Sequence, residues 1–340
     1  MFREMERRLI GLANTFAPRI AREFDRLRPV IEEIEWIEVN TDELGNERSA
    51  IAAVDSSFTI VESRIGLMFF VQGLAQAWSR RLGSSSLRFA DCGFIEVEGL
   101  STKLGRRRVA PKHILSSYAQ LLELENVYNL ASRMEENPTV LIDGSVIAFT
   151  INRAVKGDGV VTSIDRGSIR LSDICRRRLR LVVLLARSFL TLFIAKSSWA
   201  SVLTSSSIPD LYLLEIARVV RYRPISMPGF TKPRYIEIDE LVRATRWNRE
   251  ELESAGLKCI TCLYVRLREG AQAFQVTAVG RLSERDARRI FEILYPWSKD
   301  IGYPIPLESV HRLSKLERRD LVESLHRLGI PIVSGREVLE

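Results

Sequence analysis

Short hydrophobic runs separated by polar turns divide most of the chain into candidate strands and helices. Apolar runs of strand length lie at residues 49–61, 65–76, 87–98, 139–143, 191–195, 257–267 and 272–280. Apolar residues at helical spacing predict helices at residues 114–134, 172–187, 284–297 and 314–328, and a long amphipathic helix or helical pair over residues 1–36, with breaks expected at Pro18 or Pro29. This order predicts an α/β fold, a mixed sheet flanked by helices with an N-terminal helical extension.

The connections are less regular than these elements. The first three strands follow one another with short links, and Gly83–Ser86 is expected to be a turn between two of them, so they should form an antiparallel meander. Residues 147–170 are expected to be an insertion or loop, and residues 211–220 a strand or short helix. Residues 221–240 contain three prolines and should be loop with some strand.

Two aspartates follow buried strand patterns. Asp55 follows the run Ile51–Val54, and Asp143 follows Thr139–Ile142. If these strands are parallel neighbours, both carboxylates lie at the same end of the sheet, where open α/β sheets bind their ligands. A lone aspartate there is usually a turn or cap residue. Two converging carboxylates instead favour a site for Mg²⁺ or Mn²⁺, because these ions prefer oxygen donors.

Charge and composition narrow the class of protein. The chain has 50 Lys and Arg against 43 Asp and Glu, a net charge of +7, which is compatible with a polyanionic partner. Arg outnumbers Lys and suits bidentate phosphate contacts, although such a composition also arises from genome bias or growth temperature. No apolar stretch reaches the roughly 18 uncharged residues that a membrane span needs, and the N-terminus lacks signal-peptide features, so we expect a cytoplasmic protein without membrane contacts.

The four cysteines do not indicate a disulfide framework. Cys259 and Cys262 have the spacing of a zinc-ligand pair, but the sequence offers no second pair at a suitable distance. They lie in a strand pattern, in which residues three apart face opposite sides. We therefore expect neither zinc binding nor redox chemistry from this pair.

Five segments together resemble the NurA nuclease family. They are Ala53-Val-Asp-Ser-Ser-Phe58, Leu141-Ile-Asp-Gly-Ser145, Ile194-Ala-Lys-Ser197, Pro209-Asp-Leu-Tyr-Leu-Leu-Glu215 and Gly302-Tyr-Pro-Ile-Pro-Leu-Glu-Ser-Val-His311. The resemblance spans roughly residues 50–315, and the last segment is the most specific. It implies an RNase H-like core and a DNA nuclease, with 5′–3′ exonuclease and single-strand endonuclease activity, that uses Mn²⁺ or Mg²⁺, two ions per active site.

The same resemblance implies partners and a division of the chain. It implies a homodimer that threads DNA and docks on a HerA-like hexameric translocase, in DNA end resection for double-strand break repair. Residues 1–40 would form a helical segment for partner or dimer contacts, and residues 41–340 the nuclease domain. The open alternatives are a non-catalytic DNA-binding accessory subunit and an RNase H-like nuclease that cuts RNA–DNA hybrids.

The resemblance also implies a set of site residues. Its metal site uses two aspartates, a helix glutamate and a histidine, which correspond here to Asp55, Asp143, either Glu123 or Glu125, and His311; Glu123 is preferred slightly. His311 would bind metal, protonate the leaving group or orient water. The family usually has glycine after the first aspartate, whereas this chain has Ser56 and Ser57. Serine there leaves the turn geometry open, because glycine would permit a positive φ.

Further residues have a functional and a structural interpretation. Lys196 would contact a phosphate near the metals or be a solvated strand end, and Tyr303 would stack on a base, position a phosphate or pack beneath a Pro-rich loop. Arg106, Arg107 and Arg108 would contact DNA, and Arg176–Arg178 with Arg180 would line a channel or form solvated faces. Asp210 and Glu215 would extend the acidic cluster or cap a helix.

Overall fold

The computed structural model describes residues 3–45, 47–63, 66–79, 83–97, 110–298 and 302–330. Its strands are β1 (Trp36–Glu38), β2 (Ile51–Ser63), β3 (Gly66–Ser79), β4 (Gly83–Val97), β5 (Thr139–Asp143), β6 (Gly159–Ser163), β7 (Gly167–Arg170), β8 (Thr191–Ala195), β9 (Gly229–Thr231), β10 (Arg234–Glu237), β11 (Cys259–Arg266) and β12 (Phe274–Val279). They form one sheet in the order β1-β9-β11-β12-β8-β5-β2-β3-β4-β6-β7, with β10 beside β11.

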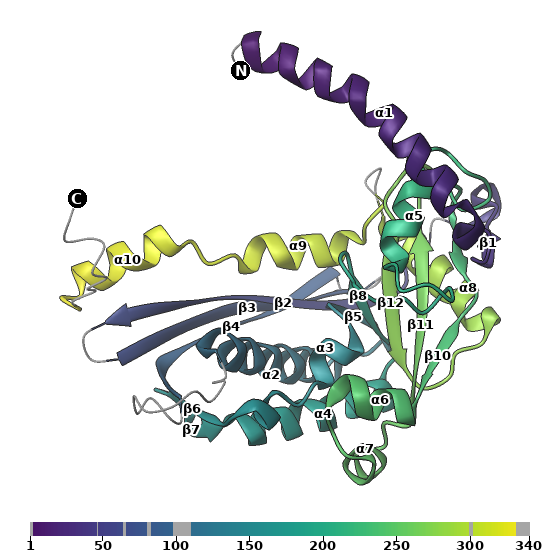
Figure 1. The fold of residues 1–340 in the computed structure, drawn as a ribbon. Helices are drawn as coiled ribbons and strands as arrows, with labels where there is room; N and C mark the ends of the chain where they lie inside the picture. Colours follow the sequence, from purple (N-terminus) through teal and green to yellow (C-terminus); the bar gives the residue numbers. More distant parts are fainter. Residues whose placement is uncertain are drawn as a thin grey trace.

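Helices cover both faces of this sheet. Their bounds are α1 (Arg3–Ile31), α2 (Pro111–Ala131), α3 (Val146–Thr150), α4 (Leu171–Ser188), α5 (Asp210–Val219), α6 (Ile238–Thr245), α7 (Arg249–Ala255), α8 (Glu284–Leu294), α9 (Ile305–Ser314) and α10 (Arg318–Arg327), with short 3₁₀ turns at Thr41–Glu43, Arg153–Lys156 and Tyr295–Trp297. Helices α2 and α4 lie below the long strands in Figure 1, and α9 lies above them.

Each face has its own hydrophobic core, because strand side chains alternate between faces. Ala52, Val54 and Ile142 pack towards α2 and α4. Ala53 and Leu141 pack on the opposite face, towards α8 and α9. The mixed α/β sheet predicted from the sequence is therefore correct. The face on which each strand residue lies determines which side chains can meet at the site described below.

The centre of the sheet joins parallel and antiparallel pairs. Strands β2, β3 and β4 form the expected antiparallel meander, and β2, β5 and β8 are parallel neighbours. Gly83–Ser86 is not a turn: it begins β4 and pairs with the end of β3, as in Ala77 opposite Ser85. Two such long strands gain ladder hydrogen bonds along their whole length, which outweighs the low strand propensity of Gly and Ser.

Other expectations had mixed outcomes. Residues 147–170, expected to be an insertion or loop, contain α3, a 3₁₀ turn and the β6–β7 hairpin. For residues 211–220, the helical alternative is confirmed by α5. Helices α6 and α7 were not predicted; they are short, and their stability comes from packing of Leu241 and Leu252 into the core. Helix α1 continues through Pro18 and Pro29. Its last turns are anchored by buried Leu27 and Ile31.

The C-terminal Pro-rich segment is also more helical than expected. Helix α9 begins at Ile305, directly after Pro304, and includes Pro306 in its first turn. Proline is tolerated there, because the first helical N–H groups have no intrahelical partner. His311 therefore lies on a helix, and the helix expected at 314–328 begins at Arg318.

Cys259 and Cys262 do not converge, as expected. The Cys259 thiol lies 3.7 Å from a carboxylate oxygen of Glu237, whereas the Cys262 thiol accepts a hydrogen bond of 3.3 Å from Gln275 in the core. Burial raises the pKa of the Cys259 thiol to about 11 and that of Cys262 to about 12. Both cysteines are therefore protonated structural residues at neutral pH. Across the described residues, no helix is long and apolar enough to cross a membrane.

Candidate active site

The two strand aspartates lie level with each other in the sheet. In the parallel pair of β2 and β5, Val54 is opposite Ile142, so Asp55 and Asp143 are the next positions on each strand. Strand β5 ends at Asp143, whereas β2 continues to Ser63 with β3 alone. Asp55 is therefore inside a long strand, at the point where its parallel neighbour ends. The prediction that Asp55 and Asp143 lie at the same end of two parallel neighbouring strands is confirmed.

Both aspartates face α9. They share a side of the sheet with Ala53 and Leu141, whose core cluster contains the α9 residues Leu307 and Val310. The Asp55 carboxylate lies 2.6 Å from Nδ1 of His311, and the Ser314 hydroxyl donates to the same oxygen at 3.4 Å. The imidazole is held through Nδ1, and its side chain remains 63% exposed.

Glu123 approaches from the opposite face. It lies on α2, which packs against β2, and it is 7% exposed. The Ser56 hydroxyl donates a short hydrogen bond to its carboxylate. Because Ser56 follows Asp55 on an extended strand, its side chain points to the α2 face while Asp55 points to α9. The site therefore contains carboxylates from both faces of the sheet. Asp55 and Asp143 come from the α9 face and Glu123 from the α2 face, at the point where β5 ends.

The two serines after Asp55 remain in extended strand conformation. Ser56 and Ser57 pair with Gly73 and Gln72 of β3, so no positive φ is needed there. The Ser57 hydroxyl accepts a hydrogen bond of 3.0 Å from the backbone N–H of Leu316, just after α9. Serine thus adds a contact on each face that glycine could not make.

Gly144 takes the positive φ instead, after Asp143. It adopts φ +128°, and Ser145 then caps α3 by accepting a hydrogen bond of 3.2 Å from the N–H of Ala148. A side chain at Gly144 would be strained in this conformation. The Asp-Gly-Ser sequence therefore ends β5 and turns the chain into a helix beside the site.

The carboxylates repel one another electrostatically. Burial raises the pKa of Glu123 well above its usual range, and the charges of Asp55 and Asp143 raise it further, against the Ser56 hydrogen bond. Burial and Asp55 also raise the pKa of Asp143, while Lys196 and His311 oppose the shift. Uncompensated negative charge of this kind favours binding of a cation.

Glu125 does not join this cluster. Its carboxylate pairs with Arg166 at 2.6 Å and with Arg177 at 3.3 Å. Residues two apart on a helix are separated by about 200° around its axis, so Glu123 and Glu125 point to different sides of α2. Of the two candidate glutamates, only Glu123 lies beside the aspartates.

Lys196 and Tyr303 form the far side of the site. The Lys196 ammonium lies 4.0 Å from the centre of the Tyr303 ring, which also packs edge-on against Phe274. Tyr303 is 8% exposed, so its ring does not face solvent, and stacking of a base on it is not supported. Burial, Asp143 and Asp55 raise the pKa of its hydroxyl. That hydroxyl is buried and makes no hydrogen bond within the described residues.

Gly302 makes this placement of Tyr303 possible. It adopts φ +71°, and a Cβ at this position would collide with Ala271. Any larger residue would push the loop away and move the Tyr303 ring.

The donor types suit a divalent cation such as Mg²⁺ or Mn²⁺. Asp55, Asp143 and Glu123 supply hard oxygen donors, and the unpaired Tyr303 hydroxyl lies within range of the aspartate charges. In the described ranges, however, no group of three or more His, Cys, Asp or Glu side chains is arranged to hold a metal ion. Glu123 is turned to Ser56 and Asp55 to His311, so binding a metal through all three carboxylates would require side-chain rotation.

Asp210 and Glu215 lie outside the cluster. The buried Asp210 carboxylate accepts hydrogen bonds of 2.8 Å from the N–H of Val202 and from the Tyr264 hydroxyl. Glu215 pairs with Arg218 on the same helix. Asp210 therefore fixes the loop before α5, and neither residue extends the acidic site.

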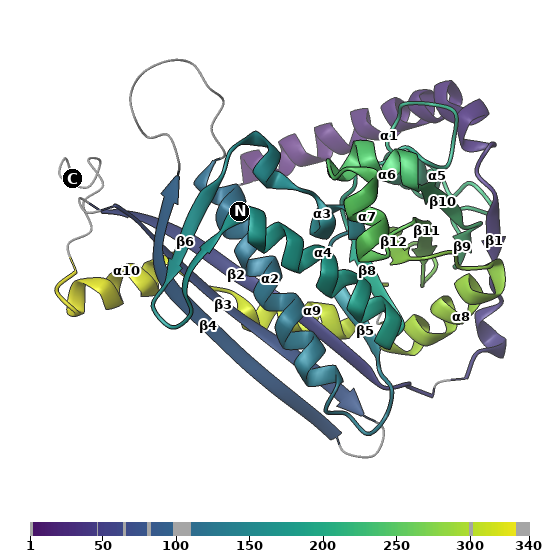
Figure 2. The same ribbon diagram turned by 90° about the horizontal axis from the view of Figure 1, so that it is seen from below.

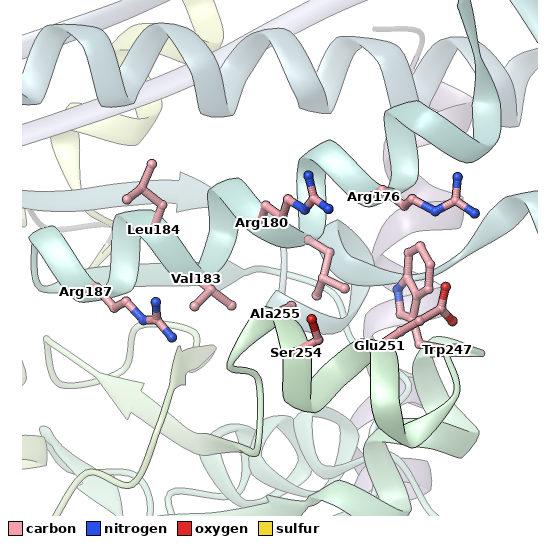
Figure 3. A pocket seen from close by; sticks show the side chains of 10 residues that line it. Arg176, Arg180, Val183, Leu184, Arg187, Trp247, Glu251, Ser254 and Ala255 are labelled. Carbon is pink, nitrogen blue, oxygen red and sulfur yellow. The ribbon is translucent and has the colours of Figure 1, made fainter.

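The arginines predicted as a cluster on α4 do not form one surface. Arg106, Arg107 and Arg108 lie outside the described residues. On α4, Arg178 is fully buried and donates to the Ile151 carbonyl at 2.9 Å, while Arg177 pairs with Glu125. The side chains of Arg176 and Arg180 point elsewhere again: with Arg187 and Trp247, they line a groove of about 460 Å³ between α4 and α7 (Figure 3). Figure 2 shows α4 and α7 on the α2 side of the sheet.

Ser56 and Ser314 are the site residues that sequence reasoning missed. Strand alternation places Ser56 on the face opposite Asp55, but only the packing of α2 shows which residue Ser56 contacts there. Ser314 follows His311 by three residues, a helical spacing that becomes informative only once α9 is recognised as a helix.

Comparisons with known proteins identify the family and the fold of this chain. The family model described as NurA domain matches residues 49–316. The crystal structure of the NurA nuclease from Sulfolobus solfataricus is similar with a TM-score of 0.64 at 19% identity, over 97% of each chain. A structure described as NurA bound to dAMP and manganese is similar with a TM-score of 0.57 at 15% identity, over 98% of this chain and 99% of that one.

No curated protein matches the chain. At such identities the solved structures show a shared fold. The family assignment comes from the domain model, which covers more than half of the chain, from just before β2 to just after α9. On that evidence the chain belongs to the NurA family.

Proposed function

We propose that this protein is a metal-dependent nuclease that hydrolyses DNA phosphodiester bonds. The observation that carries the proposal is the convergence of Asp55 and Asp143 from one face of the sheet and Glu123 from the other, with the pKa values of Glu123 and Asp143 raised by burial and mutual repulsion. A similar structure is described as NurA bound to dAMP and manganese.

Each residue has a distinct role in this proposal. Asp55, Asp143 and Glu123 hold one or two Mn²⁺ or Mg²⁺ ions, which supply positive charge to the phosphoryl oxygens and lower the pKa of water. His311 is oriented by Asp55 through Nδ1, so Nε2 is available to transfer a proton to the leaving oxygen or from water. Lys196, whose ammonium lies over the Tyr303 ring, positions the phosphate from the opposite side.

The central strands support an RNase H-like core. An antiparallel meander, β2-β3-β4, is followed by the parallel strands β5 and β8, in the spatial order β4-β3-β2-β5-β8. The carboxylates come from its first and fourth strands and from the intervening helix α2. We assign residues 41–340 to this nuclease domain.

Residues 1–40 are assigned to contacts with a partner or a second protomer. Helix α1 projects from the body at its N-terminal end (Figure 1) and exposes Met5, Leu12 and Phe16, with exposed fractions of 51%, 62% and 52%. These positions are seven and four residues apart, so they lie along one side of the helix. This surface suits a homodimer or a HerA-like hexameric translocase, as expected for 5′–3′ end resection in double-strand break repair.

Digestion assays test the enzyme directly. The full-length protein, with Mn²⁺, should degrade DNA, and chelator should abolish this activity. Asp55→Asn should reduce cleavage by more than about 100-fold, because even outer-shell changes at metal sites cost 10- to 100-fold. Asp173→Asn changes an exposed aspartate that pairs with Arg176; it is the matched control and should retain activity.

Three results would contradict the proposal. Cleavage by Asp55→Asn at the wild-type rate would exclude this site. DNA binding without cleavage, with the translocase supplied, would indicate an accessory subunit. Preference for an RNA–DNA hybrid over single- and double-stranded DNA would indicate a hybrid nuclease.

A further inference from the structure

Trp199 is unusually exposed for a tryptophan. Its exposed fraction is 91%, whereas Trp36, Trp247 and Trp297 are each 9% or less and Trp78 is half-buried. Tryptophan is a large apolar residue that is normally well buried. An indole that is almost entirely exposed to solvent, on a backbone of fixed conformation, therefore indicates a binding role.

Hydrogen bonds fix the loop that carries Trp199. The Ser198 hydroxyl accepts a hydrogen bond of 3.1 Å from the N–H of Ala200, and the Ala200 carbonyl accepts one of 2.9 Å from the N–H of Asp210. The buried Asp210 carboxylate then accepts hydrogen bonds from Val202 and Leu203. The indole is thus presented on an ordered backbone, which lowers the entropy lost on binding a ligand.

The position of the loop relates Trp199 to the candidate active site. Trp199 follows Lys196 by three residues, so their Cα atoms are at most roughly 10 Å apart. Lys196 lies over Tyr303 and lowers the pKa of Asp143, so its ammonium faces the carboxylate cluster. Trp199 therefore lies on the loop that directly follows this residue of the candidate active site.

We propose that Trp199 stacks on an unpaired base of single-stranded DNA next to the phosphate held at the candidate active site. This inference rests on the proposed nuclease function and specifies its substrate: the flat indole offers a stacking surface to a base that is not already stacked in a duplex. Aromatic stacking is tolerant of sequence, because every base has a π-face. Lys196, beside the loop, supplies a positive charge for the adjoining phosphate.

Fluorescence of the full-length protein in chelator tests the proposal without cleavage. Since Trp199 is the most solvent-exposed of the five tryptophans, it should contribute the red-shifted part of the emission. Titration with a short oligothymidylate should quench that part. Trp199→Ala should remove the quenching and weaken oligothymidylate binding by about 5- to 150-fold, whereas Trp199→Phe should retain part of the affinity.

A matched control uses another exposed apolar side chain. Ile164 is 73% exposed and follows β6 in the turn of the β6–β7 hairpin, which four strands separate from β8 in the sheet order. Figure 2 shows β6 and β8 on different sides of the molecule. Ile164→Ala should leave oligothymidylate affinity unchanged. A loss of affinity equal to that of Trp199→Ala would overturn the proposal, because it would show a general effect of removing surface apolar groups.

Other outcomes separate this inference from the nuclease proposal. If wild-type protein cleaves DNA and Trp199→Ala binds oligothymidylate with wild-type affinity, the stacking inference fails and the nuclease stands. If oligothymidylate quenches Trp199 but no DNA is cut, the stacking inference stands and the nuclease fails. If the emission instead shifts to the blue with protein concentration, and Trp199→Ala lowers the oligomer mass without changing oligothymidylate affinity, a second copy covers Trp199 and the inference is overturned.

Discussion

Removing the charge of Glu123 should make the metal-free protein more stable while making it a poorer nuclease. In Glu123→Gln the side-chain amide oxygen can still accept the Ser56 hydrogen bond, so the packing of α2 against β2 is retained. Only the ionised carboxylate is lost. In the absence of metal that carboxylate is buried and repelled by Asp55 and Asp143.

The size of the effect follows from the geometry of β2. Glu123 is bonded to Ser56, and Asp55 is the preceding residue on the opposite face. Two unit charges about 8 Å apart at an effective dielectric constant of about 20 repel each other by about 2 kcal/mol. For a chain of 340 residues, with an unfolding entropy of about 2.1 cal/mol/K per residue, a gain of about 2 kcal/mol raises Tm by about 3 °C.

The pH dependence has a definite sign. Because the folded-state pKa of Glu123 is raised above 4.5, the folded protein holds this proton more tightly than the unfolded chain does. The stability of wild-type protein should therefore fall as the pH rises from about 4.5 through the folded-state pKa. The stability difference between Glu123→Gln and wild type should vanish at the acidic end of this window and be complete above it.

Calorimetry or thermal shift, in chelator and in Mn²⁺, measures both effects. Mn²⁺ at about 100 times its Kd should stabilise wild type by about 2.7 kcal/mol, and Glu123→Gln should gain much less. Glu125→Gln is the matched control: it loses partly exposed ion pairs with Arg166 and Arg177, worth about 1 kcal/mol or less, and should keep the full response to Mn²⁺. A lower Tm for Glu123→Gln in chelator at neutral pH, or an unchanged Mn²⁺ response, would refute the reasoning.

Two further predictions concern residues on either side of the site. His311→Ala should lower single-turnover cleavage by about 10²- to 10⁴-fold with little change in DNA affinity measured in chelator; a loss of affinity of the same size would instead assign His311 to binding. Asp210→Ala should lower the free energy of unfolding by about 2–4 kcal/mol, because the N–H groups of Val202 and Leu203 and the O–H of Tyr264 lose their acceptor. Urea denaturation measures this, and a change below about 0.5 kcal/mol would contradict the structural role.

Local patterns were sufficient for the strands that carry the aspartates. The runs before Asp55 and Asp143 are short and, apart from Thr139, apolar, which is the signature of strands buried on both faces. Parallel pairing of these strands then brings the two carboxylates together. The cysteine prediction held for the same reason, since alternation on a strand separates Cys259 from Cys262.

Local patterns failed where tertiary packing sets the conformation. The Pro-rich segment before His311 was predicted to be loop, because the tolerance of proline in a first helical turn depends on whether a helix packs there at all. Helices α6 and α7 are too short to be stable alone, so their formation depends on burying Leu241 and Leu252 in the common core.

The sequence by itself determined the α/β class, the meander, the two converging aspartates and the family to which the chain belongs, because these depend on residue identity and on side-chain alternation along a strand. Only the tertiary structure decided between Glu123 and Glu125, joined His311 to Asp55, and brought Ser56 to Glu123. The physical reason is that each of these contacts depends on which side of a helix faces the sheet, and that is set by the packing of α2 and α9 on opposite faces of β2.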